Sequence, residues 1–185
     1  MQVNLLWTGR AYYSLENCLV MEASAGFEIR STIIGLYQEK IYQVDYHIRT
    51  NAAWETMSAD ISCRYGNALR HIVLEREGQG RWKENGKEAA GYKDCIDIDI
   101  SLTPFTNTLP IRRLQLKPGD SRELKVVYCD LLNGQTHPVY QRYTCLNVEE
   151  YHYENIPNDF EATIRVDQSG FVVDYPGLFV RTAIS

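Results

Sequence analysis

Short runs in which apolar and polar residues alternate recur along almost the whole chain, and turn signals such as Asn85-Gly86 and Asn133-Gly134 separate them. A period of two is typical of strands that bury one face. No window of ten residues carries an apolar repeat of helical spacing, and only 147–155 is expected to form a short helical turn. The sequence therefore predicts an all-β fold, with strands near 3–8, 16–22, 27–34, 41–49, 56–64, 69–76, 80–84, 94–102, 109–116, 122–130, 138–147, 160–167 and 170–174.

Length and composition favour one folded domain over residues 1–185. Apolar residues make up 44% of the chain, which is enough to build a core. The formal net charge of −5, without a basic stripe, argues against a nucleic-acid partner. No apolar run approaches the roughly 20 residues that span a bilayer, and the first residues lack the features of a signal peptide. We therefore expect no membrane-spanning segment.

The cysteines and histidines show no pattern typical of a disulfide framework or a metal site. The five cysteines are widely spaced and form no CxxC pair, which favours reduced, packed thiols in a cytoplasmic protein. The four histidines lack metal-ligand spacing, and no nucleotide-binding or hydrolase motif occurs. Neither a metal ion nor another cofactor is expected.

The two halves of the chain echo one another in the same order, which predicts an internal duplication. The units run from about 1 to 91 and from 92 to 185, and no linker separates them, so we expect one continuous sheet rather than two domains. The echoing pairs are 16–21 with 93–98, Val44 with Val126, Tyr46 with Tyr128, Cys63 with Cys145, and 75–80 with 165–170.

Five segments of the chain form a recognisable signature: Asp97-Ile98-Asp99, Thr103-Pro104, the run TNTLPIRRL at 106–114, Gly80-Arg81-Trp82 and the run DYPGLF at 174–179. They resemble the signature of a bacterial family known as Putative glycolipid-binding, and the resemblance covers nearly the whole chain. It implies a spiral β-roll of many antiparallel strands with internal duplication. It also implies non-catalytic binding of a glycolipid or a similar amphiphile.

The segment 94–114 holds the candidate ligand-binding residues, which are Asp97, Asp99, Asn107, Arg112 and Arg113. The two aspartates share one face of the strand predicted at 94–102. The two arginines face opposite sides of the strand predicted at 109–116, so one of them points inward. An inward arginine must be paired, either with one of the aspartates or with an anionic head group of a ligand. We expect the structural pairing, with Asn107 and one arginine on the polar rim of a groove between sheet faces.

Aromatic side chains supply surface that either packs on sheet faces or contacts sugar rings and acyl chains, and packing is the expected role for each one. They include Trp7, Trp54, Trp82, Tyr12, Tyr13, Tyr140, Tyr143, Tyr151 and Tyr153.

Two other functions remain open from the sequence. A protein-interaction or assembly module would have a filled interior and an exposed apolar patch or edge strand. A hydrolase would use Asp97 and Asp99, whose Cα atoms lie about 6.5–7 Å apart on a strand, within the range that glycosidases use. Nothing in the sequence places this pair in a cleft, so we expect a binding protein rather than an enzyme.

Overall fold

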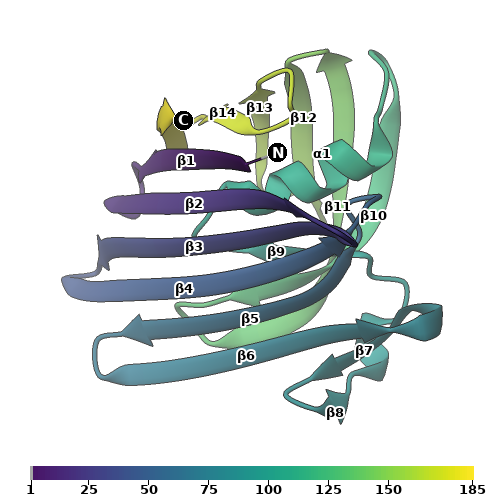
Figure 1. Ribbon diagram of the computed structural model, residues 1–185. Coiled ribbons are helices and arrows are strands. Elements are labelled where there is room, and N and C mark those ends of the chain that lie inside the picture. Colours follow the sequence, from purple (N-terminus) through teal and green to yellow (C-terminus); the bar gives the residue numbers. More distant parts are fainter. Residues whose placement is uncertain (1) are drawn as a thin grey trace.

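The protein folds into one large, curled β-sheet, which confirms the expected all-β roll (Figure 1). The structure is a computed structural model and describes residues 2–185, apart from the side chain of residue 79. Its strands are β1 (Gln2–Gly9), β2 (Ser14–Ala23), β3 (Gly26–Tyr37), β4 (Lys40–Asn51), β5 (Thr56–Tyr65), β6 (Ala68–Glu77), β7 (Arg81–Glu84), β8 (Lys87–Glu88), β9 (Asp97–Ile100), β10 (Ser121–Asp130), β11 (Gln135–Asn147), β12 (Glu150–Ile156), β13 (Glu161–Val166), β14 (Val172–Tyr175) and β15 (Phe179–Ile184). Its helical elements are η1 (Gly78–Gly80), η2 (Ala90–Tyr92), η3 (Phe105–Asn107) and α1 (Thr108–Leu114).

Strand β1 lies in the middle of the sheet, where it pairs with β2 on one side and with β15 on the other. The order runs from β8 through β1 to β15 and then to β9, so the first and last strands of the chain join the two halves. All of these pairs are antiparallel except β9–β10. The sheet curls until its two halves meet. Arg70 of β6 donates to the carbonyls of Leu131 and Leu132, at 2.8 Å each, beside the β10–β11 turn.

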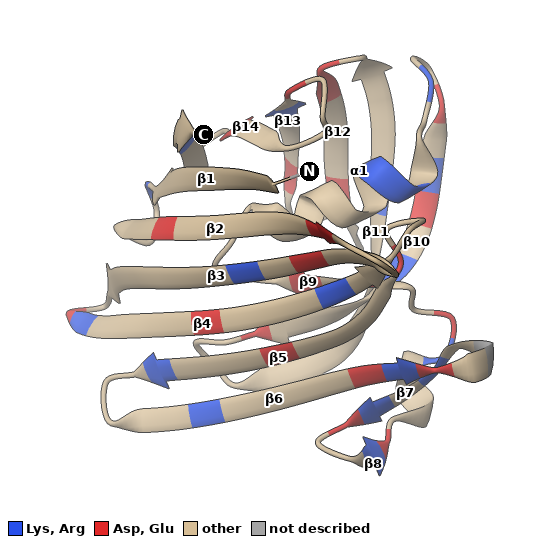
Figure 2. Ribbon diagram, in the orientation of Figure 1, with Lys and Arg blue, Asp and Glu red and all other residues tan. Residues whose placement is uncertain are grey.

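The alternating sequence pattern decides which face of each strand is buried. In β4, Tyr42, Val44, Tyr46 and Ile48 are buried while the residues between them are more exposed. In β9, Ile98 and Ile100 join the main apolar core and Asp97 and Asp99 lie on the other face, but here both faces are covered and Asp97 is fully buried. Acidic and basic residues are interspersed along the strands (Figure 2).

A stretch of ten consecutive buried residues, 102–111, fills part of the space between the two halves of the sheet. We call this stretch the plug. Its side chains join both apolar clusters of the protein: Leu102, Phe105 and Leu109 pack in the core shared with β1–β7, and Ile111 packs with β11–β15. In Figure 1, α1 lies in front of β10–β12 and beside β1 and β2. The plug therefore contacts both halves of the sheet.

The strand predicted at 109–116 is wrong, because this segment contains α1. Pro110 is the third residue of α1, where a backbone N–H has no partner within the helix and its loss costs little. Gln115 ends the helix in the left-handed conformation, with φ of 47°. The helical turn predicted at 147–155 is also wrong. Those residues enter β12, whose inward tyrosines keep the period of two.

The internal duplication is not confirmed and stays a prediction. The strand that contains Cys18 is followed by a hairpin partner, β3, whereas the segment that contains Cys95 leads through β9 into the plug and α1. β9 then pairs with β10 in parallel, a connection that β2 does not share.

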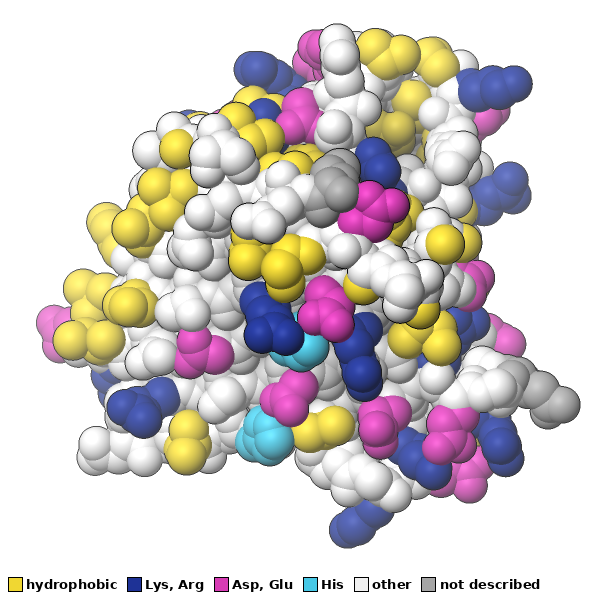
Figure 3. All heavy atoms as spheres, in the orientation of Figure 1, with side chains coloured by type: hydrophobic (Ala, Val, Ile, Leu, Met, Phe, Trp, Pro, Cys, Tyr) yellow, Lys and Arg dark blue, Asp and Glu magenta, His cyan; other side chains and the backbone are white. Residues whose placement is uncertain are grey.

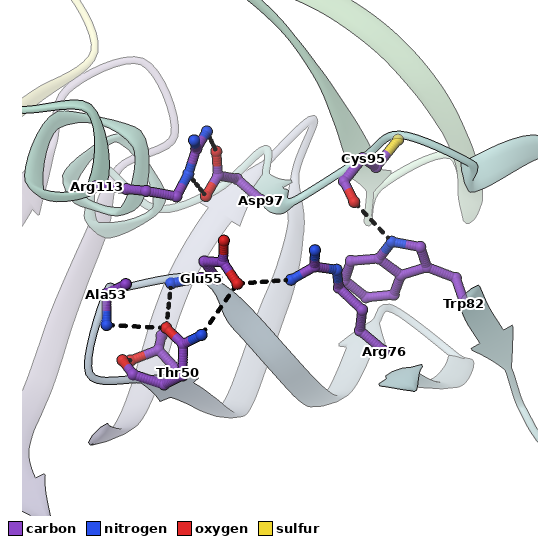
Figure 4. Close-up of polar contacts among 9 residues, drawn as sticks. Thr50, Ala53, Glu55, Arg76, Trp82, Cys95, Asp97 and Arg113 are labelled. Carbon is purple, nitrogen blue, oxygen red and sulfur yellow. Dashed lines mark hydrogen bonds and ion pairs between the residues drawn. The ribbon is translucent and has the colours of Figure 1, made fainter. Parts of the chain in front are cut away.

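A buried ion pair fixes the end of α1 to β9. Arg113 donates from Nε to Oδ1 of Asp97 at 3.1 Å and from Nη2 to Oδ2 at 2.5 Å, and the two side chains are 14% and 1% exposed. A second pair, between Arg76 and Glu55 at 3.2 Å, lies beside it (Figure 4). Bidentate geometry offsets part of the desolvation cost of such a pair. The expected pairing of one arginine with one of the two aspartates is confirmed, on a helix rather than on a strand.

Replacing Asp97 by asparagine should destabilise the protein by about 3–5 kcal/mol, because Arg113 would remain buried without a carboxylate. Urea unfolding at pH 7 measures the change in the free energy of unfolding. Asp60→Asn is the matched control, since Asp60 is 58% exposed in its pair with His71 and should cost less than about 1 kcal/mol. Equal losses in the two variants would contradict the structural role of the Asp97 pair.

Candidate functional site

A groove of about 470 Å³ lies between the inner face of β10–β12, the β14–β15 region and the plug. This volume is typical of small-molecule sites in proteins. Asp99 and Ile100 of β9, the turn between β1 and β2, and the loop between β12 and β13 also line it. The interior of the roll is thus filled by the chain in one part and hollow in another.

Aromatic rings form a continuous wall of the groove. Neighbouring ring centroids lie 6.0 Å apart from Tyr12 to Phe179, 6.3 Å from Phe179 to Tyr175 and 6.2 Å from Tyr175 to Tyr153. Phe160 extends the wall at 6.1 Å from Tyr153, and it is 39% exposed. Rings that pack on one another in this way hold each other in place and present a large apolar surface.

Polar side chains form the floor of the groove. The carboxylate of Asp99 accepts hydrogen bonds from Gln141 Nε2 at 2.7 Å and from Thr106 Oγ1 at 2.9 Å. Asn107 accepts a hydrogen bond from the hydroxyl of Tyr143 at 2.8 Å. Burial raises the pKa of Asp99, and the two hydrogen bonds that it accepts act in the opposite direction. The floor therefore offers a carboxylate and an amide whose positions are already fixed by neighbouring groups.

The groove brings together two of the five predicted ligand-binding residues, Asp99 and Asn107. Asp97 and Arg113 are engaged in their buried ion pair and do not line the groove. Arg112 also lies outside it, because both arginines sit in the last turn of α1 instead of on two faces of a strand.

The side chain of Arg112 is held against another part of the surface. Its guanidinium lies 4.8 Å from the centroid of the Trp54 ring and donates to the carbonyl of Ser169 at 2.7 Å. Both contacts satisfy the cation within the fold, so Arg112 has a packing role in this structure.

Reasoning from the sequence missed several groove residues, namely Phe160, Tyr175, Phe179 and Gln141. Tyr175 and Phe179 lie in the run 174–179 that carries part of the family resemblance, and this was the one signal that pointed to them. Gln141 carries no local signal, because its place on the floor depends on β11 lying beside the plug.

Acid–base chemistry by the two aspartates needs both of them at one cavity, and the structure gives only Asp99 access to the groove. Burial raises the pKa of Asp97 even though Arg113 lowers it. This carboxylate is enclosed by its partner, so the pair does not form a shared catalytic site.

One group of potential metal ligands occurs among the described residues. His152, Glu154 and Glu161 place ligand atoms within 4.8 Å of one another on β12 and β13. These carboxylates also lie near Arg142, at 3.5 Å from Glu154, and Asn158, at 3.2 Å from Glu161. Arg142 and Asn158 thus compete with any cation for the same oxygens.

A buried glutamate joins the plug to the first half of the sheet. Oε1 of Glu16 accepts hydrogen bonds from Ser31 Oγ at 2.8 Å, Tyr46 Oη at 2.7 Å and Thr103 Oγ1 at 2.8 Å. The other oxygen, Oε2, is buried without a hydrogen-bond partner in the structure, and Glu16 is 2% exposed. Burial raises the pKa of Glu16 to about 7 against the three hydrogen bonds. Thr103 also lines the groove, so this carboxyl supports one side of it.

Fold and groove together define the chain as an all-β roll with an internal, ligand-sized groove. The family model described as Putative glycolipid-binding matches residues 4–181, and the chain belongs to that family. The expected family resemblance is therefore confirmed.

A solved structure supports the same assignment. The crystal structure of a DUF1089 family protein from Pseudomonas aeruginosa is similar to this chain, with 32% sequence identity and a TM-score of 0.81 over 90% of this chain and 91% of that one. A comparison with curated proteins gave no match. Among residues 2–185, no helix has the length and apolar character needed to cross a membrane.

Replacing Glu16 by glutamine should remove a pH dependence of stability. The pKa of Glu16 is about 7 in the folded state and near its ordinary value of 4.5 in the unfolded chain, so the folded state binds more protons between these values. The free energy of unfolding should therefore fall by about 3 kcal/mol as the pH rises from 4.5 to above 7. In urea unfolding at pH 5 and pH 8, the free energy of unfolding of Glu16→Gln should exceed that of the natural chain by about this amount at pH 8.

Glu75→Gln serves as the control, because Glu75 is exposed on β6 and should show the pH dependence of the natural chain. If Glu16→Gln and the natural chain differ by the same amount at both pH values, Glu16 does not titrate as the structure requires.

Proposed function

We propose that this protein binds one amphiphilic molecule with a glycolipid-like head in the groove and performs no reaction on it. The observation that carries the proposal is a cavity of about 470 Å³ with aromatic walls and a polar floor. A surface that is apolar on one side and hydrogen-bonding on the other suits a molecule with the same division. The family description points in the same direction.

The two parts of the ligand would contact different parts of the groove. The acyl part would lie against the wall formed by Tyr153, Tyr175 and Phe179, where burial contributes roughly 0.8 kcal/mol per CH₂ group. The head would contact Asp99 and Asn107 on the floor. This arrangement replaces the arginine rim expected from the sequence, because both arginines are engaged elsewhere.

Two observations support the remaining parts of the proposal. Asp97 is enclosed in an ion pair, which removes the candidate catalytic pair from the groove and supports a binding role. All five cysteines are free and buried, which supports a reducing compartment such as the cytoplasm.

A protein-interaction role is the second candidate, and an exposed apolar patch favours it. Leu15, Ile34, Leu36 and Ile41 are 52%, 57%, 44% and 70% exposed on the outer face of β2–β4. Figure 3 shows apolar side chains gathered at this end of the strands, on the left. Patches of this kind often contact other proteins. The groove favours the first candidate, since an assembly module needs no hollow interior.

Phe160→Ala should weaken binding of octyl glucoside by about fivefold to tenfold, because an aromatic ring at the groove would be lost. Isothermal titration calorimetry below the critical micelle concentration measures the dissociation constant. Leu69→Ala is the control, because Leu69 is 67% exposed on β6 and lies outside the groove. The proposal fails if the natural chain shows no saturable binding, or if the two variants bind alike.

A further inference from the structure

The charged side chains at the groove are acidic. Asp99 lies on its floor and Asp159 at its edge, and no lysine or arginine belongs to its lining among the described residues. The one ionisable base there, His137, packs edge-on against the ring of Tyr128 at 5.6 Å between centroids. A ligand that enters the groove therefore meets carboxylates and aromatic rings, and no fixed cation.

The two aspartates of β9 show how unusual the position of Asp99 is. Asp97 has a guanidinium partner at 2.5 Å. Asp99, two residues further on, has only neutral donors, Gln141 and Thr106, within the part of the chain that the structure describes. A carboxylate that is largely withdrawn from water and has no cation beside it attracts a cationic ligand strongly.

The negative charge of Asp99 affects the tyrosines of the aromatic wall. Burial and, after it, the Asp99 charge raise the pKa values of Tyr128 and Tyr153, because a phenolate would be repelled. The pKa of Tyr175 is raised in the same way: burial has the largest effect, followed by Tyr153 and then by Asp99. The potential in the groove is therefore negative, which favours a cation and opposes an anion.

We propose that the head group taken by this groove is a protonated amine, held between the carboxylate of Asp99 and the aromatic wall. This inference rests on the proposed binding function and names the charge of its ligand. An ammonium group donates up to three hydrogen bonds, and the carboxylate oxygens of Asp99 keep free lone pairs beside the single donor that each accepts. Aromatic faces add cation–π attraction. A phosphate or sulfate head would be repelled by the same charges.

Three detergents with the same eight-carbon chain test the proposal by calorimetry at pH 7 and low salt, each below its critical micelle concentration. They are octylamine, which is protonated at this pH, neutral octyl glucoside and anionic octyl phosphate. The natural chain should bind octylamine at least tenfold more tightly than octyl glucoside, and octyl phosphate most weakly. The preference should shrink as salt is added.

Asp99→Asn keeps the shape of the side chain and removes its charge, so the ratio of octylamine to octyl glucoside affinity should fall to near one. Asp60→Asn, on the outer face of β5, should keep the ratio of the natural chain. Thermal unfolding shows whether each variant is folded. If Asp99→Asn does not fold, the comparison of the three detergents on the natural chain still tests the charge preference of the groove.

The outcomes separate the two proposals. If octyl glucoside binds and octylamine binds no more tightly, or if octyl phosphate matches octylamine, the charge inference is wrong while the binding function stands. If none of the three detergents binds, both proposals are wrong.

Discussion

The structure depends on burying the plug between the two halves of a single curled sheet. Ten consecutive buried residues include polar ones, and every buried polar group needs a partner to offset its lost hydration. Two contacts provide part of this compensation and reach different parts of the sheet: Glu16 accepts from Thr103 at one side, and Tyr143 donates to Asn107 at the other. Beyond the plug, the ion pair of Asp97 and Arg113 fixes the end of the helix. An open sheet has no closed barrel wall to hold its curvature, so the plug performs that task.

The groove is a consequence of the same arrangement. The plug fills the space next to β1–β7 and leaves a hollow beside β10–β12, because on this side it presents polar side chains, with Thr106 bonded to Asp99 and Asn107 bonded to Tyr143, rather than apolar ones that would fill the space. Asp99 of β9 connects the two: it accepts a hydrogen bond from Thr106 of the plug, and it lines the groove. Stability and recognition therefore share residues. Changes at the plug should alter the groove as well as the fold.

Much of the fold follows from the sequence, because the period of two records which strand face is buried. It predicted most strands of both halves and the opposite orientation of Ile98 and Asp97. It failed at 109–116, where residues 109–111 are buried in succession and leave no alternation between a buried and an exposed face. The site was predicted less well. Sequence reasoning identified Asp99 and Asn107 but missed the wall around Tyr175. That wall depends on contacts between β12, β14 and β15, which no local pattern encodes.

The central claim is that the hollow beside the plug, rather than the outer apolar patch, holds the ligand. Intermolecular nuclear Overhauser effects between the octyl chain of octyl glucoside and isotopically labelled protein test it most directly. We expect contacts from the octyl chain to the rings of Tyr153, Tyr175 and Phe179, which form the wall. Contacts confined to Ile34 and Ile41 on the outer face, with none to these rings, would contradict it.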